Sequence, residues 1–439
     1  MAGIVGIDVG GTFTDLYFSG GEGRAHHILK VPSTPHDPSV GLLHALEKAH
    51  LQPGELDAIL HGTTIATNAV IERKGARCAL ITTRGFRDLL ELGRRDRPQM
   101  YGLEGVHEPL VPRELRFEVD ERLDHEGQVL RPLDEAGLHA VAEALQELKV
   151  EAVVISFMHA YANTAHEDQA RAILHAINPA WELVTATSVV REYYEFERTS
   201  TAVVQGYLQP LVARYARNLA DKLKGWGYER EVAIMQSNGG VAPLRQLSER
   251  AAYIVRSGPA AGVTAAARIA AESGFSHVIT GDMGGTSFDV SLVAEGEAAL
   301  AAQTSIEFGL VVRSPMIQIE TIGAGGGSIA SVDASDMLQV GPESAGSVPG
   351  PACYDRGNTR PTVTDANVLL GRIAADRPLG GGLLQAMQSH LSELAIQKHV
   401  AEPLGLSTLE AAEAILTVAN AKMAGAVRVV SIEKGHDPR

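Results

Sequence analysis

One pattern occurs twice in the chain, as IDVGGTFTD at residues 7–15 and as GDMGGTSFD at residues 281–289. In both copies an Asp stands two positions before Gly-Gly-Thr, and a second Asp ends the pattern. Each copy lies between two apolar runs, which predicts a β-hairpin whose turn glycines can take positive φ. Gly-Gly in a hairpin is by itself ordinary turn chemistry. The repetition of all five residues at two distant places instead favours a shared ligand.

The pattern is suited to phosphate. A turn without side chains exposes a concave set of backbone N–H groups, and neighbouring Thr or Ser hydroxyls add further donors to phosphate oxygens. A carboxylate does not face phosphate favourably, but it can hold a hydrated Mg²⁺ ion that bridges phosphate oxygens. The sequence therefore predicts two hairpins that face each other and clamp one polyphosphate.

Length and composition limit what surrounds these hairpins. A chain of 439 residues predicts two or three domains, each with its own apolar core. Two cysteines make no disulfide framework, and no run of roughly 20 uncharged residues is present, so we expect a cytoplasmic protein without a membrane span. The formal charge of −15 argues against a broad nucleic-acid-binding surface.

Hydrophobic periodicity predicts layered α/β domains. The first three apolar runs are joined by short loops, so we expect an antiparallel meander. Residues 134–150 carry apolar side chains at helical spacing, and the continuous apolar run at 152–158 predicts a fully buried strand. Residues 85–133 break the alternation, and we interpret them as an insertion that we expect to lie over the active site.

The two copies resemble the phosphate loops of the superfamily that joins acetate and sugar kinases, heat-shock ATPases and actin. The resemblance implies an α/β fold in which two ribonuclease-H-like (actin-like ATPase) domains close over ATP, here residues 1–265 and 266–439. It also implies that Asp8 and Asp282 hold Mg²⁺ through water and that Asp282 orients or deprotonates the attacking group. The implied phosphate-binding residues are Gly10, Gly11, Thr12, Thr14, Gly258, Gly284, Gly285, Thr286 and Ser287.

Further stretches narrow the match. HGTTIATNAVIERKGA (61–76), SNGG (237–240), TIGAGGGSIA (321–330) and PACYDRGNTRPTVTDANVLLGR (351–372) resemble the hydantoinase A and 5-oxoprolinase family. That resemblance implies an ATP-dependent subunit that phosphorylates the carbonyl oxygen of a hydantoin, oxoproline or lactam for ring opening, with a hydantoinase B-type subunit as partner. The alternatives are the ATP-activating subunit of a ketone carboxylase and a nucleotide-binding assembly module without catalysis of its own.

Substrate contacts are expected where HGTTIATN follows an apolar run, because strand ends are common ligand sites in α/β layers. An equally open interpretation is helix capping by Thr63 or Thr64 within a satisfied polar cluster. Asn238 is a second-rank candidate, since SNGG also suits a plain turn. The candidate substrate residues are His61, Thr63, Thr64, Asn68 and Asn238.

Three other features of the sequence are less specific. His159, His166 and Asp168 are imidazoles and a carboxylate near one predicted turn, but their spacing is not diagnostic of a metal site. Cys353 has no visible base partner, so a structural thiol is favoured over a nucleophile. The glycine run at 323–328 lacks the full dinucleotide fingerprint, and we expect a flexible loop near the nucleotide or a hinge.

The last 33 residues begin with a capping-box pattern, Ser407 with Glu410, and continue as an amphipathic helix. The family resemblance implies that a glycine-rich adenosine-binding segment should follow, and these 439 residues do not contain it. We therefore expect the second domain to be incomplete, with the remainder supplied by a longer chain or by a separate polypeptide.

Overall fold

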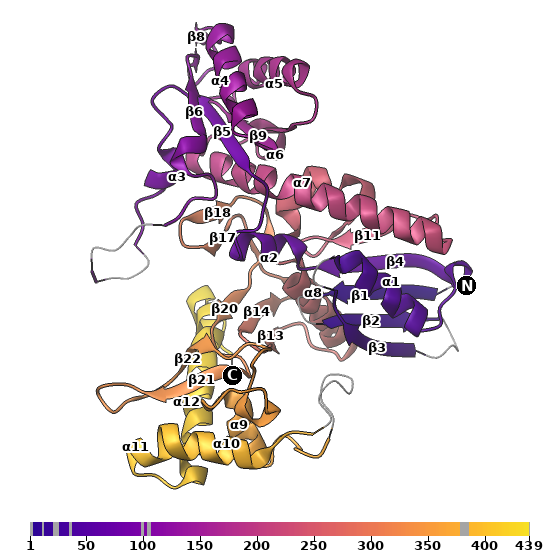
Figure 1. Cartoon of the computed structure of the whole chain (residues 1–439), viewed down its shortest axis with the longest axis vertical. Coiled ribbons are helices and arrows are strands. Elements are labelled where there is room, and N and C mark those ends of the chain that lie inside the picture. The colour runs from indigo at the N-terminus through magenta and orange to yellow at the C-terminus, as the bar shows by residue number, and fades with distance from the viewer. Residues whose placement is uncertain are drawn as a thin grey trace. The chain divides into compact units, whose positions relative to one another are not determined.

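The computed structural model describes residues 3–10, 13–20, 26–34, 37–97, 101–102, 107–377 and 386–438. The chain divides into two compact units (Figure 1). Unit 1 comprises residues 1–28, 32–258 and 300–316, and unit 2 comprises residues 29–31, 259–299 and 317–439. The main division lies in the first turn of α8 (Ser257–Glu272), a few residues before the boundary expected from the sequence.

The first sheet of unit 1 consists of six strands, in the order β12 (Val241–Pro243), β11 (Val232–Met235), β4 (Leu56–Thr63), β1 (Gly3–Val9), β2 (Phe13–Ser19) and β3 (His26–Pro32). β1 and β2 pair antiparallel with Asp8 opposite Asp15, so the first copy of the pattern forms the predicted hairpin. β4 and β11 run parallel to β1. The carboxyl ends of these three strands therefore meet at one edge, where α/β sheets commonly bind ligands.

The second sheet of unit 1 is entirely parallel, in the order β10 (Glu182–Thr185), β9 (Ala152–Ser156), β5 (Cys78–Thr83) and β6 (Arg116–Val119). All five residues of β9 are buried, as its apolar run predicts. α4 (Glu135–Glu147) covers the predicted helix and buries Leu138, Ala142 and Leu145. β6 comes from the segment interpreted as an insertion and is a strand of this sheet.

The long helix α7 (Glu195–Trp226) connects the two sheets of unit 1 (Figure 1). It packs on β9 and β10 of the second sheet and on α1 (Pro38–Lys48), which covers β1 and β2 of the first. A Cβ on Gly206 would lie 2.5 Å from a methyl carbon of Val154, so the glycine permits close approach to β9. The other elements of unit 1 are α2 (Ile65–Ile71), α3 (Leu89–Leu92), α5 (Ala165–Ile177), α6 (Ala186–Val189), β7 (Arg122–Leu123), β8 (Val129–Arg131), β16 (Leu300–Ala301), β17 (Thr304–Glu307), β18 (Leu310–Val312) and 3₁₀ turns at Pro53–Glu55, Arg113–Leu115, Leu244–Gln246 and Ser248–Ile254.

Unit 2 carries the second copy of the pattern on the hairpin of β13 (Val278–Met283) and β14 (Phe288–Ala294), with Asp282 opposite Asp289. β14 also pairs with β15 (Glu297–Ala298) and β20 (Glu320–Ile322). The other elements are β19 (Met316–Ile317), β21 (Ser328–Val332), β22 (Leu338–Ser344), α9 (Val363–Leu369), α10 (Ser389–Ile396), a π-helical segment at Gln397–Ala401, α11 (Glu402–Leu404), α12 (Thr408–Val430) and 3₁₀ turns at Ala352–Tyr354 and Ile432–Lys434.

The core of unit 2 forms where α12 packs on α9 and β22, with Ile415, Val363 and Val340 among its buried side chains. The predicted capping box is present at the start of α12, where Ser407 accepts a bond from the Glu410 N–H. Residues 408–434 are long and apolar enough to cross a membrane by length and composition alone. Because the buried face of α12 is part of this core, a core helix accounts for the same composition.

The motif at 351–372 folds around one carboxylate. Asp365 is fully buried and accepts hydrogen bonds from the backbone N–H groups of Ala352, Cys353 and Thr362, at 2.8 to 3.0 Å. The hydroxyls of Thr362 and Ser392 donate to the same carboxylate, each at 2.8 Å. A buried carboxylate is stable only when it is satisfied in this way, so Asp365 joins the start of α9, the 352–354 turn and α10.

Candidate functional site

The hydroxyl groups of Ser33 and Thr14 support the first hairpin turn. The Gly10 N–H donates to the Phe13 carbonyl at 2.9 Å and closes the turn, while the Ser33 hydroxyl donates to the Gly10 carbonyl at 2.7 Å. Thr14 is fully buried, and its hydroxyl lies 3.0 Å from that of Ser33. The Thr14 hydroxyl thus supports the turn in this structure. Gly11 and Thr12, also predicted to bind phosphate, lie outside the described residues.

Two glycines leave room for the Asp8 carboxylate. Asp8 is exposed at the end of β1, directly opposite Gly62 of β4. A Cβ on Gly62 would lie 2.7 Å from Asp8 Oδ1, and a Cβ on Gly258 would lie 3.9 Å from the same oxygen. The structure therefore brings Asp8, Gly62 and Gly258 together at the edge where the parallel strands end.

His61, a candidate substrate residue, is a core side chain. It is fully buried, with Nδ1 3.1 Å from the Ile7 carbonyl and Nε2 2.5 Å from the Tyr215 hydroxyl. Burial lowers the pKa of the imidazole to about 4, so the ring is neutral at physiological pH. Through these two contacts the His61 ring joins β4 to β1 and to α7, which is a structural role.

The remaining candidates of HGTTIATN form a polar cluster at the start of α2. Thr63 is buried and its hydroxyl accepts from the Ile65 N–H at 3.3 Å, while Thr64 lies at the N-cap position of α2 and donates to the Val9 carbonyl at 3.3 Å. The Asn68 amide donates to the Thr64 hydroxyl at 3.2 Å. The cluster thus ties α2 to the end of β1, beside Asp8. Asn238 is exposed in the turn after β11 and accepts from the Gly240 N–H at 2.9 Å.

The second hairpin turn presents its backbone to the surface of unit 2. The Gly284 N–H donates to the Ser287 carbonyl at 2.9 Å, which closes the turn as in the first copy. Asp282, Gly284, Gly285 and Thr286 are exposed, and Ser287 is half-buried. An exposed carboxylate beside an open glycine turn is the arrangement expected for a hydrated Mg²⁺ ion and a phosphate.

The glycine run at 323–328 packs directly on this second turn. The Gly326 N–H donates to the Gly284 carbonyl at 3.0 Å, and the Gly327 N–H donates to the Gly285 carbonyl at 2.6 Å. A Cβ on Gly325 would lie 2.6 Å from both the Gly285 carbonyl carbon and the Thr286 nitrogen. The sequence suggested a flexible loop for this run, whereas its backbone is fixed to the second turn by two hydrogen bonds. Only residues without side chains allow this approach.

α9 in turn holds the glycine run. The backbone N–H and the hydroxyl of Thr364 both donate to the Gly326 carbonyl, at 2.8 and 2.9 Å. Thr364 follows the N-cap residue Thr362 and precedes Asp365, so the carboxylate-centred motif at 351–372 and the second turn form one continuous unit of hydrogen bonds. Sequence reasoning missed Thr364 and Gly62 as supports, since neither the register of β4 on β1 nor the contact of α9 with residue 326 is visible in the sequence.

No group of three or more His, Cys, Asp or Glu side chains that could hold a metal ion occurs among the described residues. His166 is paired with Glu121 at 2.7 Å, and Asp168 accepts from Thr164 at 2.7 Å, so the residues weighed as a transition-metal site serve other contacts. Single carboxylates such as Asp8 and Asp282 still fit Mg²⁺, which retains several water ligands. Cys353 is buried, and burial raises its thiol pKa, so it is not activated as a nucleophile.

The chain belongs to the hydantoinase/oxoprolinase family. The family's sequence profile matches residues 198–439, and the profile of the hydantoinase/oxoprolinase N-terminal region matches residues 4–178. Together the two matches include both hairpin turns and the motifs at 61–76, 321–330 and 351–372. The family predicted from the sequence is thereby confirmed.

Three relatives illustrate the similarity. The caprolactamase subunit alpha of Pseudomonas jessenii is 40% identical over 99% of this chain, and the acetophenone carboxylase gamma subunit of Aromatoleum aromaticum is 37% identical over 99%. The crystal structure of the ATP-dependent caprolactamase from Pseudomonas jessenii is 38% identical and superposes over 99% of the chain with a TM-score of 0.85. The predicted α/β fold class is therefore confirmed. The chain spans only 62 to 64% of the length of these proteins.

Gly62→Ala tests the space around Asp8. The added methyl would overlap the Asp8 carboxylate and displace it, so we expect the affinity for Mg·ATP to fall by about tenfold or more, the loss of one charge-assisted contact. Calorimetric titration measures this loss. Gly225→Ala is the matched control, because a Cβ there meets nothing within 4 Å, and equal affinities in both variants would contradict the role given to Asp8.

Gly325→Ala tests the packing behind the second turn. The methyl would meet the main chain of Gly285 and Thr286, which cannot rotate away as a side chain can. We expect weaker Mg·ATP binding together with a lower melting temperature. Gly262→Ala, at an open position inside α8, should leave the affinity unchanged and should not lower the melting temperature, because Ala favours a helix more than Gly does. Wild-type nucleotide affinity in a folded Gly325→Ala protein would show that the turn does not need this support.

The lowered pKa of His61 predicts that the folded protein loses stability in acid. The folded protein holds the imidazole neutral down to about pH 4, whereas the unfolded chain takes up a proton near pH 6.5. Stability is therefore lost as the pH falls from 6.5 towards 4, by up to roughly 1.4 kcal/mol for each pH unit. Unfolding at a series of pH values should show a shallower dependence in His61→Gln, and identical slopes for the two proteins would be inconsistent with this protonation.

Proposed function

We propose that the chain is the ATP-dependent part of an enzyme that activates the carbonyl group of a cyclic amide. The observation that carries the proposal is the duplicated glycine turn with an exposed leading aspartate, each copy supported by dedicated contacts. Membership of the hydantoinase/oxoprolinase family supports it, as does similarity to a caprolactamase subunit described as ATP-dependent.

In this proposal the turn amides and hydroxyls bind the polyphosphate of ATP, and Asp8 and Asp282 hold Mg²⁺ through its water ligands. When bound, Mg²⁺ would supply positive charge that neutralises the phosphate oxygens. The carbonyl oxygen of the amide, in its imidate form, attacks the γ-phosphorus while the bond to the ADP oxygen breaks. Asp282 orients the amide or takes its N–H proton. Catalysis of this kind depends mainly on position and charge neutralisation, and the resulting imidate phosphate is open to attack by water.

A ketone carboxylase is the second candidate, because the acetophenone carboxylase gamma subunit is nearly as similar as the caprolactamase subunit. There the enolate oxygen of a ketone would receive the same phosphoryl group. Relatives of both kinds are named as subunits, which supports a partner protein, and we propose a hydantoinase B-type subunit. Phosphate release stimulated by lactams but not by ketones, or the reverse, separates the two candidates.

Asp282→Ala tests the proposal. Asp282 is exposed, so we expect unchanged thermal stability but a loss of substrate-stimulated phosphate release of at least about a hundredfold, as for removal of one group that stabilises the transition state. Glu297→Ala, an exposed carboxylate on β15 of the same sheet, is the control and should retain full turnover. Undiminished turnover in Asp282→Ala would remove this residue from the mechanism.

A further inference from the structure

A cluster of three aromatic rings lies at the surface of unit 1, where the loop after β9 meets the start of α7. The tyrosine cluster consists of Tyr161 in that loop and of Tyr193 and Tyr194 just before α7. The Tyr161 and Tyr193 rings meet edge to face with their centres 6.5 Å apart, and the centres of the Tyr193 and Tyr194 rings are 4.2 Å apart. Tyr193 is 62% exposed. The loop belongs to the second sheet of unit 1, whereas Asp8 ends a strand of the first.

Arginine side chains flank the tyrosine cluster. The guanidinium carbon of Arg313 lies 4.4 Å from the centre of the Tyr194 ring, and that of Arg94 lies 6.0 Å from the same centre. Arg191 donates through Nε to the Tyr161 carbonyl at 2.9 Å. Tyrosine and arginine are enriched at protein interfaces, where they contribute a large part of the binding energy. The composition of this surface is therefore typical of a protein interface.

One cation of this surface has no carboxylate partner. Three neighbouring arginines are paired with glutamates: Arg313 with Glu192, Arg94 with Glu197, and Arg198 with Glu195. Arg191 is exposed, and among the described residues its guanidinium is paired with no carboxylate. Complementary charges guide association and fix the orientation of two proteins. The charge that a partner would meet here is positive, so the surface fits a protein that presents a carboxylate beside apolar side chains.

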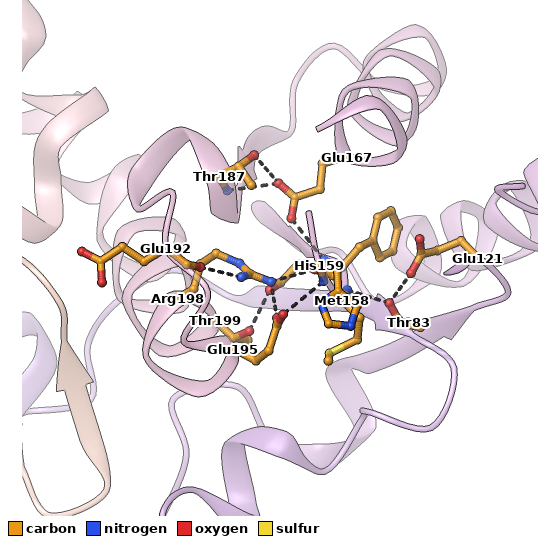
Figure 2. A network of polar contacts seen from close by, with 12 residues as sticks. Thr83, Glu121, Met158, His159, Glu167, Thr187, Glu192, Glu195, Arg198 and Thr199 are labelled. Carbon is orange, nitrogen blue, oxygen red and sulfur yellow. Dashed lines mark hydrogen bonds and ion pairs between the residues drawn. The ribbon is translucent and has the colours of Figure 1, made fainter. Parts of the chain in front are cut away.

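Buried contacts fix the main chain that carries the tyrosine cluster. Arg198 is completely buried and donates to the carbonyls of Phe157 and Glu192, at 2.8 and 2.7 Å (Figure 2). Glu195, which is paired with Arg198, accepts the backbone N–H of His159 at 3.0 Å. The loop that carries Tyr161 and the residues just before α7 are thus joined through the same buried ion pair.

The loop after β9 is also fixed from its other side. Glu167 is fully buried and accepts the Phe157 N–H at 3.1 Å and the Thr187 N–H at 3.0 Å. The Met158 N–H donates to the Thr83 hydroxyl at 2.9 Å, at the end of β5 (Figure 2). A surface whose main chain is already held in one conformation loses little entropy when a partner binds, which lowers the cost of association.

The exposure of the cluster favours a protein as its partner. A ring that is exposed to the extent of Tyr193 projects from the surface, which suits burial against another protein better than the enclosure of a small molecule. The formal charge of −15 of the chain argues against a nucleic acid. Relatives of this chain are named as subunits, so a different polypeptide is favoured over a second copy of the same one.

We propose that the tyrosine cluster is the surface on which the hydantoinase B-type subunit docks. The Tyr193 ring is buried between apolar side chains of that subunit, and Arg191 pairs with one of its carboxylates. Glu195 and Arg198 are positioning residues that hold the two segments of the cluster together. The inference rests on the proposed function for the existence of the B-type partner, and it adds the place where this chain contacts it.

Tyr193→Ala tests the aromatic contact. Calorimetric titration of the full chain with the B-type subunit of the same organism should show a Kd that rises by about thirtyfold or more, as for removal of an aromatic residue at the centre of an interface. Tyr17→Ala is the matched control, because Tyr17 is 49% exposed on the first sheet and its hydroxyl also has one side-chain hydrogen bond, to His26. The control should bind with wild-type affinity, and both variants should keep the wild-type melting temperature.

Arg191→Glu tests the charge. The substitution places a carboxylate opposite the carboxylate of the partner, so the Kd should rise by about tenfold or more. Added salt should weaken binding of the wild type, because it screens the ion pair, and should not weaken binding of this variant further. Arg191→Lys keeps the charge and should recover part of the affinity. Arg217→Glu, at an exposed arginine of α7, is the control for the change in net charge and should bind as the wild type does.

Wild-type affinity in both Tyr193→Ala and Arg191→Glu overturns the inference. Equal weakening in the Tyr17 and Arg217 controls overturns it as well, because binding would then not depend on this surface. A melting temperature that falls sharply in Tyr193→Ala does the same, since the ring would then be structural. Each protein is also titrated with Mg·ATP. Loss of nucleotide binding in the wild type contradicts the proposed function, whereas a wild-type chain that binds Mg·ATP but not the B-type subunit contradicts only this inference.

Discussion

The second unit depends on a close approach between two stretches of main chain. Gly326 and Gly327 donate to the carbonyls of Gly284 and Gly285, and the run lies so near that a Cβ at Gly325 would overlap the turn. The Gly284 N–H closes the turn on the Ser287 carbonyl, which leaves the carbonyls of Gly284 and Gly285 open to contacts from outside the turn. Its carbonyls are therefore held from the other side, and the support continues through Thr364 to Asp365 and the core of the unit.

The first turn follows the same principle with other residues. Its support comes from the hydroxyls of Ser33 and Thr14, and the space for Asp8 comes from Gly62 on the neighbouring parallel strand. In unit 2 the Asp282 carboxylate and the turn residues Gly284 to Thr286 lie at the surface, while Thr364 and Asp365 behind them are buried. In unit 1 Asp8 is exposed and Gly10 is half-buried.

Several expectations from the sequence hold because they depend on local periodicity. The two hairpins, the buried strand at 152–156, the helix at 135–147 and the Ser407 capping box are each specified by residues a few positions apart. His61 illustrates the limit of such reasoning. Its place after an apolar run and among threonines suggested ligand contact, but the pairing of β4 with β1 turns the ring towards Ile7 and Tyr215. The predicted roles in phosphate and substrate binding stay predictions.

The sequence by itself determined the α/β class, the family and the two turns, since repeated motifs and hydrophobic spacing are properties of short segments. Only the tertiary structure decided which residues support the turns. Gly62 leaves room for Asp8 in the first unit, and the glycine run at 323–328 hydrogen-bonds to Gly284 and Gly285 in the second. The physical reason is that these contacts join residues between about 40 and 55 positions apart. Strand register and helix packing set such contacts, and one sequence read along its length contains neither.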